Sequence, residues 1–272
     1  MAELAERLRD LRAQSGVAAP WPRSPIPEEL RRMLGVRTRI AAPKLLAVSA
    51  DRHVPGVEIS PGLFFIESHH DWPSVPAMID AGFANEGMIE RERLFAFDTE
   101  TTGLAGGTGT RAFMIGAADW LGERLRLRQL TITTLAAEVA MLREFTGWLG
   151  PGRVLVSFNG KSYDTPLLNT RYRLARLPSP LPGLTHLDLL HPSRRRWRGV
   201  WENCRLATIE RQVLGVVRED DLPGSEAPRA WLDYLRGGSA RNLRRVGEHN
   251  AQDLRSLAAL LQYLAAVGER DV

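Results

Sequence analysis

The sequence predicts an α/β fold in which a mixed β-sheet is covered by helices. Three observations lead to this prediction: a continuously apolar run at 94–98, two strand-like runs that follow it after short connections, and alternating strand-like and helical runs beyond residue 133. A short, continuously apolar run is typical of a strand buried on both faces. The short connections among the first three strands favour a mixed sheet over a purely parallel, doubly wound one.

Five strands and five helices are expected in this main body. The strands are expected at 94–98, 111–120, 124–132, 153–158 and 186–191. The helices are expected at 133–149, 162–177, 203–214, 227–236 and 240–266, from their apolar periodicity and their Gly and Pro boundaries. Arg and Leu alternate at 124–128, which predicts that one side of that strand faces solvent.

The chain before residue 91 is expected to form an N-terminal extension of the main domain, which spans 91–272. Leucines at helical spacing predict a short helix at 3–13, and four prolines between 20 and 27 then predict a linker. Short apolar runs interrupted by Pro-Gly pairs predict a small β-rich segment at about 44–68.

Composition excludes several classes of protein. Hydrophobic residues make up 44% of the chain and charged residues 25%, as in ordinary globular proteins. No apolar run is long enough to cross a bilayer, and the first residues lack a signal pattern, so we expect a cytoplasmic protein. The single cysteine, Cys204, excludes an internal disulfide and a thiolate metal site. A net charge of +4 is compatible with nucleic-acid binding.

Asp98 and Glu100 lie two residues apart at the end of the first main-body strand. Side chains at this spacing point to the same face of a strand. Adjacent like charges are costly unless a cation neutralises them, and carboxylate oxygens suit Mg²⁺ or Mn²⁺. A polar turn at the strand end would explain the same residues without any catalytic role.

Three more polar residues have the same two interpretations. Asp164 follows a buried strand at the start of a helix, where it either serves a site or complements the helix dipole. His249 and Asp253 lie four apart on the last helix and therefore share one face. That face either points into a site or is a solvated stripe.

Three motifs together resemble those of the DEDD, or DnaQ-like, 3′–5′ exonuclease superfamily. FDTETTGL (97–104), SFNGKSYD (157–164) and HNAQD (249–253) resemble its first, second and third motifs, in that order. CRLATIERQVLGVVREDDLPG (204–224) and GTGTRAFMIGAADW (107–120) are similar to segments of its YprB-like, ribonuclease-H-like branch. The similarity extends over residues 91–266 and implies a ribonuclease-H-like fold. Histidine-type members place the histidine five residues before the last Asp, whereas here the spacing is four.

The resemblance implies a two-metal phosphodiesterase acting at the 3′ end of single-stranded DNA or RNA. Asp98, Glu100, Asp164 and Asp253 would hold two divalent cations, Mg²⁺ or Mn²⁺, and His249 would be the general base. Two alternatives stay open: a ribonuclease-H-like endonuclease or structured-RNA nuclease with the same metal site, and a non-catalytic nucleic-acid-binding module.

Further residues are candidates for substrate binding. Thr101, Asn159, Lys161 and Tyr163 lie within the motifs, although Tyr163 equally fits packing against the sheet. Arg195 and Trp197 belong to a basic run, RRRWR (194–198), that would follow a phosphate backbone while the indole stacks on a base. A solvated charged face explains this run equally well.

Overall fold

The computed structural model describes residues 51–72, 75–103, 108–219 and 221–268. All of them belong to one unit of the chain, Ser49–Val272. The predicted helix at 3–13 and the proline-rich linker lie outside the described residues. In the described ranges, no helix has both the length and the apolar character needed to span a membrane.

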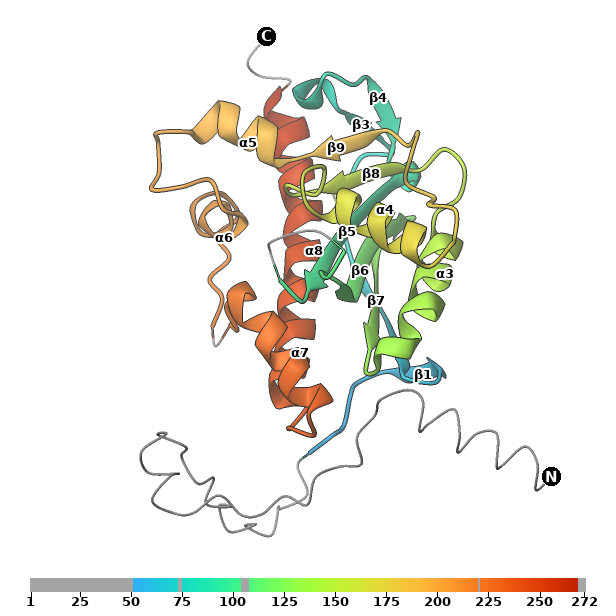
Figure 1. Ribbon diagram of the computed structural model, residues 1–272. Helices are drawn as coiled ribbons and strands as arrows, with labels where there is room; N and C mark the ends of the chain where they lie inside the picture. Colours follow the sequence, from blue (N-terminus) through green and yellow to red (C-terminus); the bar gives the residue numbers. More distant parts are fainter. Residues whose placement is uncertain (1–50, 73–74, 104–107, 220, 269–272) are drawn as a thin grey trace, which may run out of the picture. The chain divides into compact units, whose positions relative to one another are not determined.

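A seven-stranded mixed sheet forms the centre of the molecule, with the order β1-β2-β7-β6-β5-β8-β9 (Figure 1). The strands are β1 (Val57–Ser60), β2 (Leu63–Asp71), β5 (Leu94–Thr101), β6 (Ala112–Leu121), β7 (Arg124–Ile132), β8 (Val154–Ser157) and β9 (His186–Asp188). β5, β8 and β9 are parallel to one another, and the other neighbours are antiparallel. The predicted mixed α/β sheet is confirmed, and each of its five predicted strands is present.

The predicted count of five strands is wrong, because two earlier strands extend the sheet. β2 pairs with β7 along its whole length, from Leu63 opposite Ile132 to Asp71 opposite Arg124. This pairing satisfies backbone groups that an unpaired β7 edge would leave open. The predicted domain boundary at residue 91 therefore passes through a single sheet. A separate two-stranded sheet is formed by β3 (Met78–Asp80) and β4 (Met88–Glu90).

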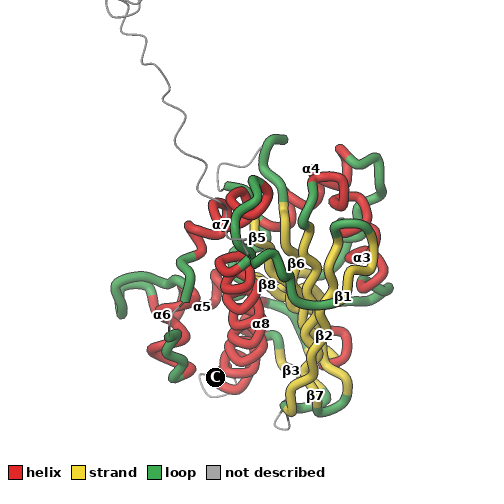
Figure 2. Tube along the Cα trace, turned by 90° about the horizontal axis from the view of Figure 1, so that it is seen from below, coloured by secondary structure: helices red, strands yellow, loops and turns green. Residues whose placement is uncertain are grey.

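Helices cover both faces of the large sheet (Figure 2). α3 (Glu138–Trp148) and α4 (Asp164–Leu174) lie on one side, and α8 (Arg241–Gly268) lies on the other. The remaining helical segments are α5 (Leu190–Trp197), α6 (Leu206–Ile209) with a π-helical turn (Glu210–Leu214), and α7 (Ala227–Leu235). Short 3₁₀ turns occur at Gly82–Ala84, Arg91–Arg93, Leu135–Ala137 and Gly224–Glu226.

The central strand β5 shows how the sheet separates its two faces. Phe95 and Phe97 pack against the ring of Phe145 in α3, with centroids 6.1 and 6.3 Å away. Leu94 and Ala96 instead belong to an apolar cluster with the leucines of α8. Because successive side chains alternate between faces, the next even-numbered residues of β5 also point towards α8.

One stretch after β8 differs from its prediction. The strand expected at 186–191 ends at Asp188, and residues 190–197, including most of the basic run, form α5. The Asp188 carboxylate accepts a hydrogen bond from the Leu190 backbone N–H at 3.1 Å. This side chain therefore satisfies a donor at the strand-to-helix transition.

Candidate metal centre

Asp98 and Glu100 lie at the end of β5, on the face that points towards α8. Asp98 is half-buried, and Glu100 is 7% exposed. Asp98 accepts a hydrogen bond from Asn250 Nδ2 of α8 at 2.9 Å. The apolar part of this face therefore ends in two adjacent carboxylates held between the sheet and one long helix.

Asp98 is oriented by Asn250 of α8, with the help of two residues that lie beside Asp98 in the sheet. Asp98 is opposite Gly116 of β6, which in turn is opposite Gln129 of β7. Gln129 Nε2 donates to Asn250 Oδ1 at 2.9 Å, so the Asn250 amide turns its Nδ2 towards Asp98. A Cβ atom on Gly116 would lie 2.0 Å from Asn250 Oδ1, so this position must be glycine for the chain of hydrogen bonds to form.

Asp164 reaches the same region from the first turn of α4. Thr99, between Asp98 and Glu100, donates a hydrogen bond from Oγ1 to Asp164 Oδ1. The loop before α4 turns at Asn159, whose φ is 68°. Asp188 accepts the backbone N–H groups of Asn159 and Lys161 at 2.7 and 3.1 Å, so it supports this loop and caps α5.

Asp253 and His249 complete the site from α8. His249 Nδ1 lies 2.8 Å from Asp221 Oδ1, and its Nε2 lies 3.6 Å from Asp253 Oδ2. Arg218 donates to Asp253 and approaches the same Nδ1 at 3.0 Å. Nδ1 can either donate to Asp221 or accept from Arg218, but not both. We assign the proton to Nδ1, donating to the Asp221 carboxylate, because that contact is the shorter one.

Arg218 is held in place by a buried acid. Glu210, 1% exposed, accepts two hydrogen bonds from the Arg218 guanidinium at 2.6 and 2.7 Å. Ser256 of α8 donates to the same carboxylate. Sequence reasoning did not select Arg218, Asp221 or Glu210, although all three lie in the 204–224 segment that resembles the YprB-like branch. It also missed Asn250, which lies inside the third motif.

The carboxylate cluster, which comprises Asp98, Glu100, Asp164 and Asp253, is strongly repulsive. The pKa of all four groups is raised, chiefly because burial disfavours the charged form. At Asp98 and Glu100 the charges of the other acids raise the pKa further. The pKa of Asp164 rises to about 6, and Arg218 reduces the rise at Asp253. These four acids therefore carry more negative charge than the single nearby guanidinium, that of Arg218, balances.

The cluster fits a hard divalent cation by its chemistry. Its ligand atoms are all carboxylate oxygens, which Mg²⁺ and Mn²⁺ prefer. Within the described parts of the chain, no three His, Cys, Asp or Glu side chains stand in a ready-made ligand arrangement. Asn250, Thr99 and Arg218 instead engage three of the four carboxylates. A cation held by the cluster would therefore compete with Arg218 for Asp253.

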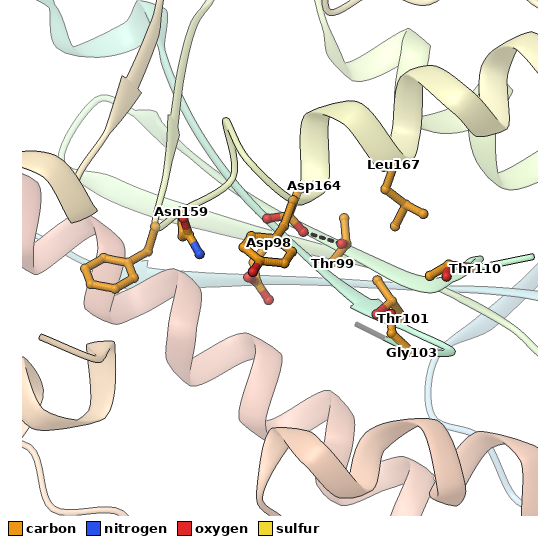
Figure 3. A pocket seen from close by; sticks show the side chains of 10 residues that line it. Asp98, Thr99, Thr101, Gly103, Thr110, Asn159, Asp164 and Leu167 are labelled. Carbon is orange, nitrogen blue, oxygen red and sulfur yellow. Dashed lines mark hydrogen bonds between the residues drawn. The ribbon is translucent and has the colours of Figure 1, made fainter. Parts of the chain in front are cut away.

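An open pocket of about 390 Å³ lies against the cluster (Figure 3). Asp98 and Asp164 project into it together with three predicted substrate-binding residues, Thr101, Asn159 and Tyr163. Tyr163 is 55% exposed, so it is an aromatic face available to a ligand and is not packed into the core. We name this space the carboxylate pocket.

The other predicted substrate-binding residues have different surroundings. Trp197 is only 7% exposed and stacks on Trp201, with centroids 5.1 Å apart, so its ring is part of the core. The proposed stacking of a base on Trp197 is therefore withdrawn. Arg195 donates to the Phe83 carbonyl and ties α5 to the turn before β4. Lys161 is exposed beside Asn159.

Fold and site define the class of protein. The chain belongs to the RNase_H superfamily, whose family model matches residues 95–265. The predicted resemblance to this superfamily is thereby confirmed, and the first relative below confirms the YprB-like branch.

The comparisons with individual proteins are as follows. The chain is 36% identical over 176 residues to the uncharacterized protein YprB of Bacillus subtilis (strain 168), an alignment covering 64% of this chain and 42% of YprB. The family B DNA polymerase of the archaeon Pyrobaculum calidifontis shares the fold with a TM-score of 0.50 and 17% identity, over 63% of this chain and 24% of the polymerase. A structure of exonuclease I matches with a TM-score of 0.38 and 14% identity, over 57% of this chain and 43% of that one.

Proposed function

We propose that this protein is a metal-dependent 3′–5′ exonuclease that hydrolyses phosphodiester bonds at single-stranded nucleic-acid ends. The observation that carries the proposal is the carboxylate cluster. Four acids from β5, α4 and α8 raise one another's pKa or are raised by burial, and only Asp253 has an arginine partner among the described residues. Such an arrangement costs folding energy, which bound cations would offset.

In this proposal Asp98, Glu100, Asp164 and Asp253 hold two Mg²⁺ or Mn²⁺ ions. When bound, such ions stabilise charge at the scissile phosphate and lower the pKa of water. Asn250 and Thr99 keep the carboxylates of Asp98 and Asp164 turned inward. These two contacts do not require a cation, so they organise the site before substrate arrives.

His249 is the proposed general base. Its Nδ1–H is directed at Asp221, which leaves Nε2, on the Asp253 side, to accept a proton from the attacking water. Imidazole is the side chain most often used to accept a proton in such a step near neutral pH. The Asp221 contact fixes the orientation of the His249 ring in this proposal.

The resemblance of the three motifs to those of 3′–5′ exonucleases supports an exonuclease over an endonuclease, and the carboxylate pocket is compatible with it. A volume of about 390 Å³ suits one nucleotide, and Tyr163 and Leu167 offer apolar surface to its base and sugar. The endonuclease and the non-catalytic binding module remain the alternatives that the experiment must separate.

The test uses end-labelled single-stranded DNA and RNA, together with a circular single strand. We expect stepwise shortening from the 3′ end that needs Mg²⁺ or Mn²⁺ and stops with chelator. Cleavage of the circle would favour the endonuclease. If no substrate is cut and calorimetry detects no Mg²⁺ or Mn²⁺ binding, the non-catalytic module is the better description.

A further inference from the structure

A second open pocket, of about 440 Å³, lies beside the carboxylate pocket. Phe158 and Asn159 line both pockets, so the two spaces share one wall. The second pocket also contains Arg194 from the last turn of α5, and Arg205 and Cys204 from the segment before α6. We name it the arginine pocket.

The two arginines of this pocket are exposed and uncompensated. In the ranges that the structure describes, the guanidinium groups of Arg194 and Arg205 form no hydrogen bond or ion pair. Neighbouring arginines differ: Arg195 donates to the Phe83 carbonyl, and Arg211 pairs with Glu202. Two guanidinium groups are therefore available to a ligand on the far side of the wall that the two pockets share.

We propose that the arginine pocket binds backbone phosphates of the nucleic-acid strand on the 5′ side of the nucleotide being removed. This inference rests on the proposed function, because it extends the same substrate beyond its terminal nucleotide. Proteins that bind single strands without sequence preference combine a cationic groove with an aromatic stacking surface. Here Arg194 and Arg205 supply the cations, and Tyr163 supplies the ring in the neighbouring pocket.

Continuity favours a nucleic acid over an acidic peptide as the occupant. A strand whose last nucleotide fills the carboxylate pocket must leave it past one of its walls. The Phe158–Asn159 wall leads directly to two arginines, which suit phosphate oxygens. The basic run 194–198 then has two roles. Arg194 faces the nucleic-acid strand, whereas Trp197 fixes α5 to the core.

The first experiment varies substrate length. In the double variant Arg194→Ala/Arg205→Ala, KM for a twenty-nucleotide single strand should rise about 10–30-fold at 0.1 M salt, with kcat little changed. The reason is that each lost phosphate contact removes about 0.7 from the slope of log affinity against log salt, or about 1.4 for two. KM for a dinucleotide should stay the same, because it does not reach the arginine pocket.

The matched control is Arg143→Ala/Arg229→Ala, which removes the same charge from exposed positions in α3 and α7. An equal KM rise in this control would overturn the proposal, since the effect would then be one of net charge. An equal rise for the dinucleotide would also overturn it.

The second experiment does not depend on hydrolysis. Cys204 is the only cysteine of the chain and lines the arginine pocket, so its reaction with a thiol reagent reports on occupancy. With chelator present, a twenty-nucleotide strand should slow modification of the wild type severalfold, but not of Arg194→Ala/Arg205→Ala. Absence of protection, or protection by polyaspartate alone, would overturn the proposal. Protection without hydrolysis of any substrate would refute the exonuclease and leave the strand-binding site standing.

Discussion

Two acidic side chains on neighbouring strands of the same sheet, Asp119 and Asp98, have opposite electrostatic surroundings. Asp119 of β6, fully buried, accepts hydrogen bonds from Arg126, Arg128 and Arg153 at 2.8–3.2 Å. Burial by itself raises the Asp119 pKa, but the Arg126 hydrogen bonds and the surrounding arginine charges lower it overall. Asp98 of β5 has no cationic partner among the described residues, and its pKa is raised well above normal.

We interpret the difference as one between charges that stabilise the fold and charges that await a ligand. At Asp119 the protein supplies its own cations, and the group is complete without any partner. At the carboxylate cluster it supplies hydrogen-bond donors to fix the geometry but leaves an excess of negative charge. A buried charge without a partner is normally strongly destabilising, which is why we propose that the neutralising charge at the cluster comes from bound cations.

The first prediction, with the largest expected effect, tests this comparison by neutralising Asp98 and Asp119 in turn. Asp98→Asn should reduce hydrolysis at least about 10⁴-fold, because losing several kcal/mol of metal-dependent stabilisation has an effect of this size. Asp119→Asn should leave the rate per folded molecule within about threefold. The measurement is single-turnover hydrolysis of end-labelled single strands, with the folded fraction determined by circular dichroism. An active Asp98→Asn enzyme would refute the assignment.

The second prediction concerns His249, whose imidazole lies beside Asp253 of the carboxylate cluster. His249→Ala should lower kcat about 10²–10⁴-fold, since proton transfer by a positioned base contributes this much. His69→Ala is the matched control, because His69 lies on β2 and pairs with Glu67 away from the cluster. A loss of less than tenfold in His249→Ala would make that residue a bystander.

The third prediction is that the two neutralising substitutions have opposite effects on the free energy of unfolding. In metal-free protein, Asp119→Asn should destabilise by about 3–5 kcal/mol, because three arginines then lose their shared partner. Asp98→Asn should instead stabilise, because it removes one of four repelling charges while its side-chain oxygen still accepts from Asn250. Urea unfolding measures both, and destabilisation by Asp98→Asn would contradict the electrostatic description.

The fourth prediction tests the hydrogen bonds that orient the carboxylate cluster. Asn250→Ala should weaken Mg²⁺ or Mn²⁺ binding about 10–100-fold, the usual cost of losing a group that orients a metal ligand. Gly116→Ala should act in the same direction, because its Cβ would displace the Asn250 amide. Calorimetric titration measures the affinity. Unchanged affinity in both variants would mean that Asp98 keeps its orientation without this support.

The fifth and smallest prediction concerns pH. A carboxyl group with a raised folded-state pKa keeps its proton where the unfolded chain has lost it, so its contribution to stability falls as pH rises through that window. For Asp164 the window runs from 3.8 to about 6. The stability advantage of metal-free Asp164→Asn over wild type should therefore grow by about 2 kcal/mol from pH 4 to pH 7, because the variant lacks this titrating group.

The comparison at each pH must be between variant and wild type, because His186 has the opposite slope. Burial lowers the pKa of His186 to about 4, so the folded protein loses stability through this group as pH falls from 6.5 towards 4. This contribution is common to both proteins and cancels. An advantage that shrinks with rising pH would contradict the raised pKa values of the cluster.

Much of the fold was accessible from local patterns. The five strands at 94–98, 111–120, 124–132, 153–158 and 186–191 were predicted because each has its own apolar run, which is a property of neighbouring residues. The addition of β1 and β2 was not predictable in this way, since pairing along a sheet edge leaves no local mark. The alternation at 124–128 was misread for a related reason: Arg126 and Arg128 look like a solvent-facing side, but Asp119 on the adjacent strand draws them inward.

The sequence by itself was enough to select the four acids and His249 as candidate site residues, because motif spacing and strand–helix context are set by the order of residues. Only the tertiary structure decided what surrounds them: Asn250 reaching Asp98 past Gly116, Arg218 held against Asp253 by Glu210, and the Trp197 ring turned into the core. Asn250 and Asp98 are 152 positions apart, and Arg218 and Asp253 are 35 apart, while the burial of Trp197 depends on which face of α5 is covered. Chain order does not record such distances, because they arise only when the sheet and its helices pack.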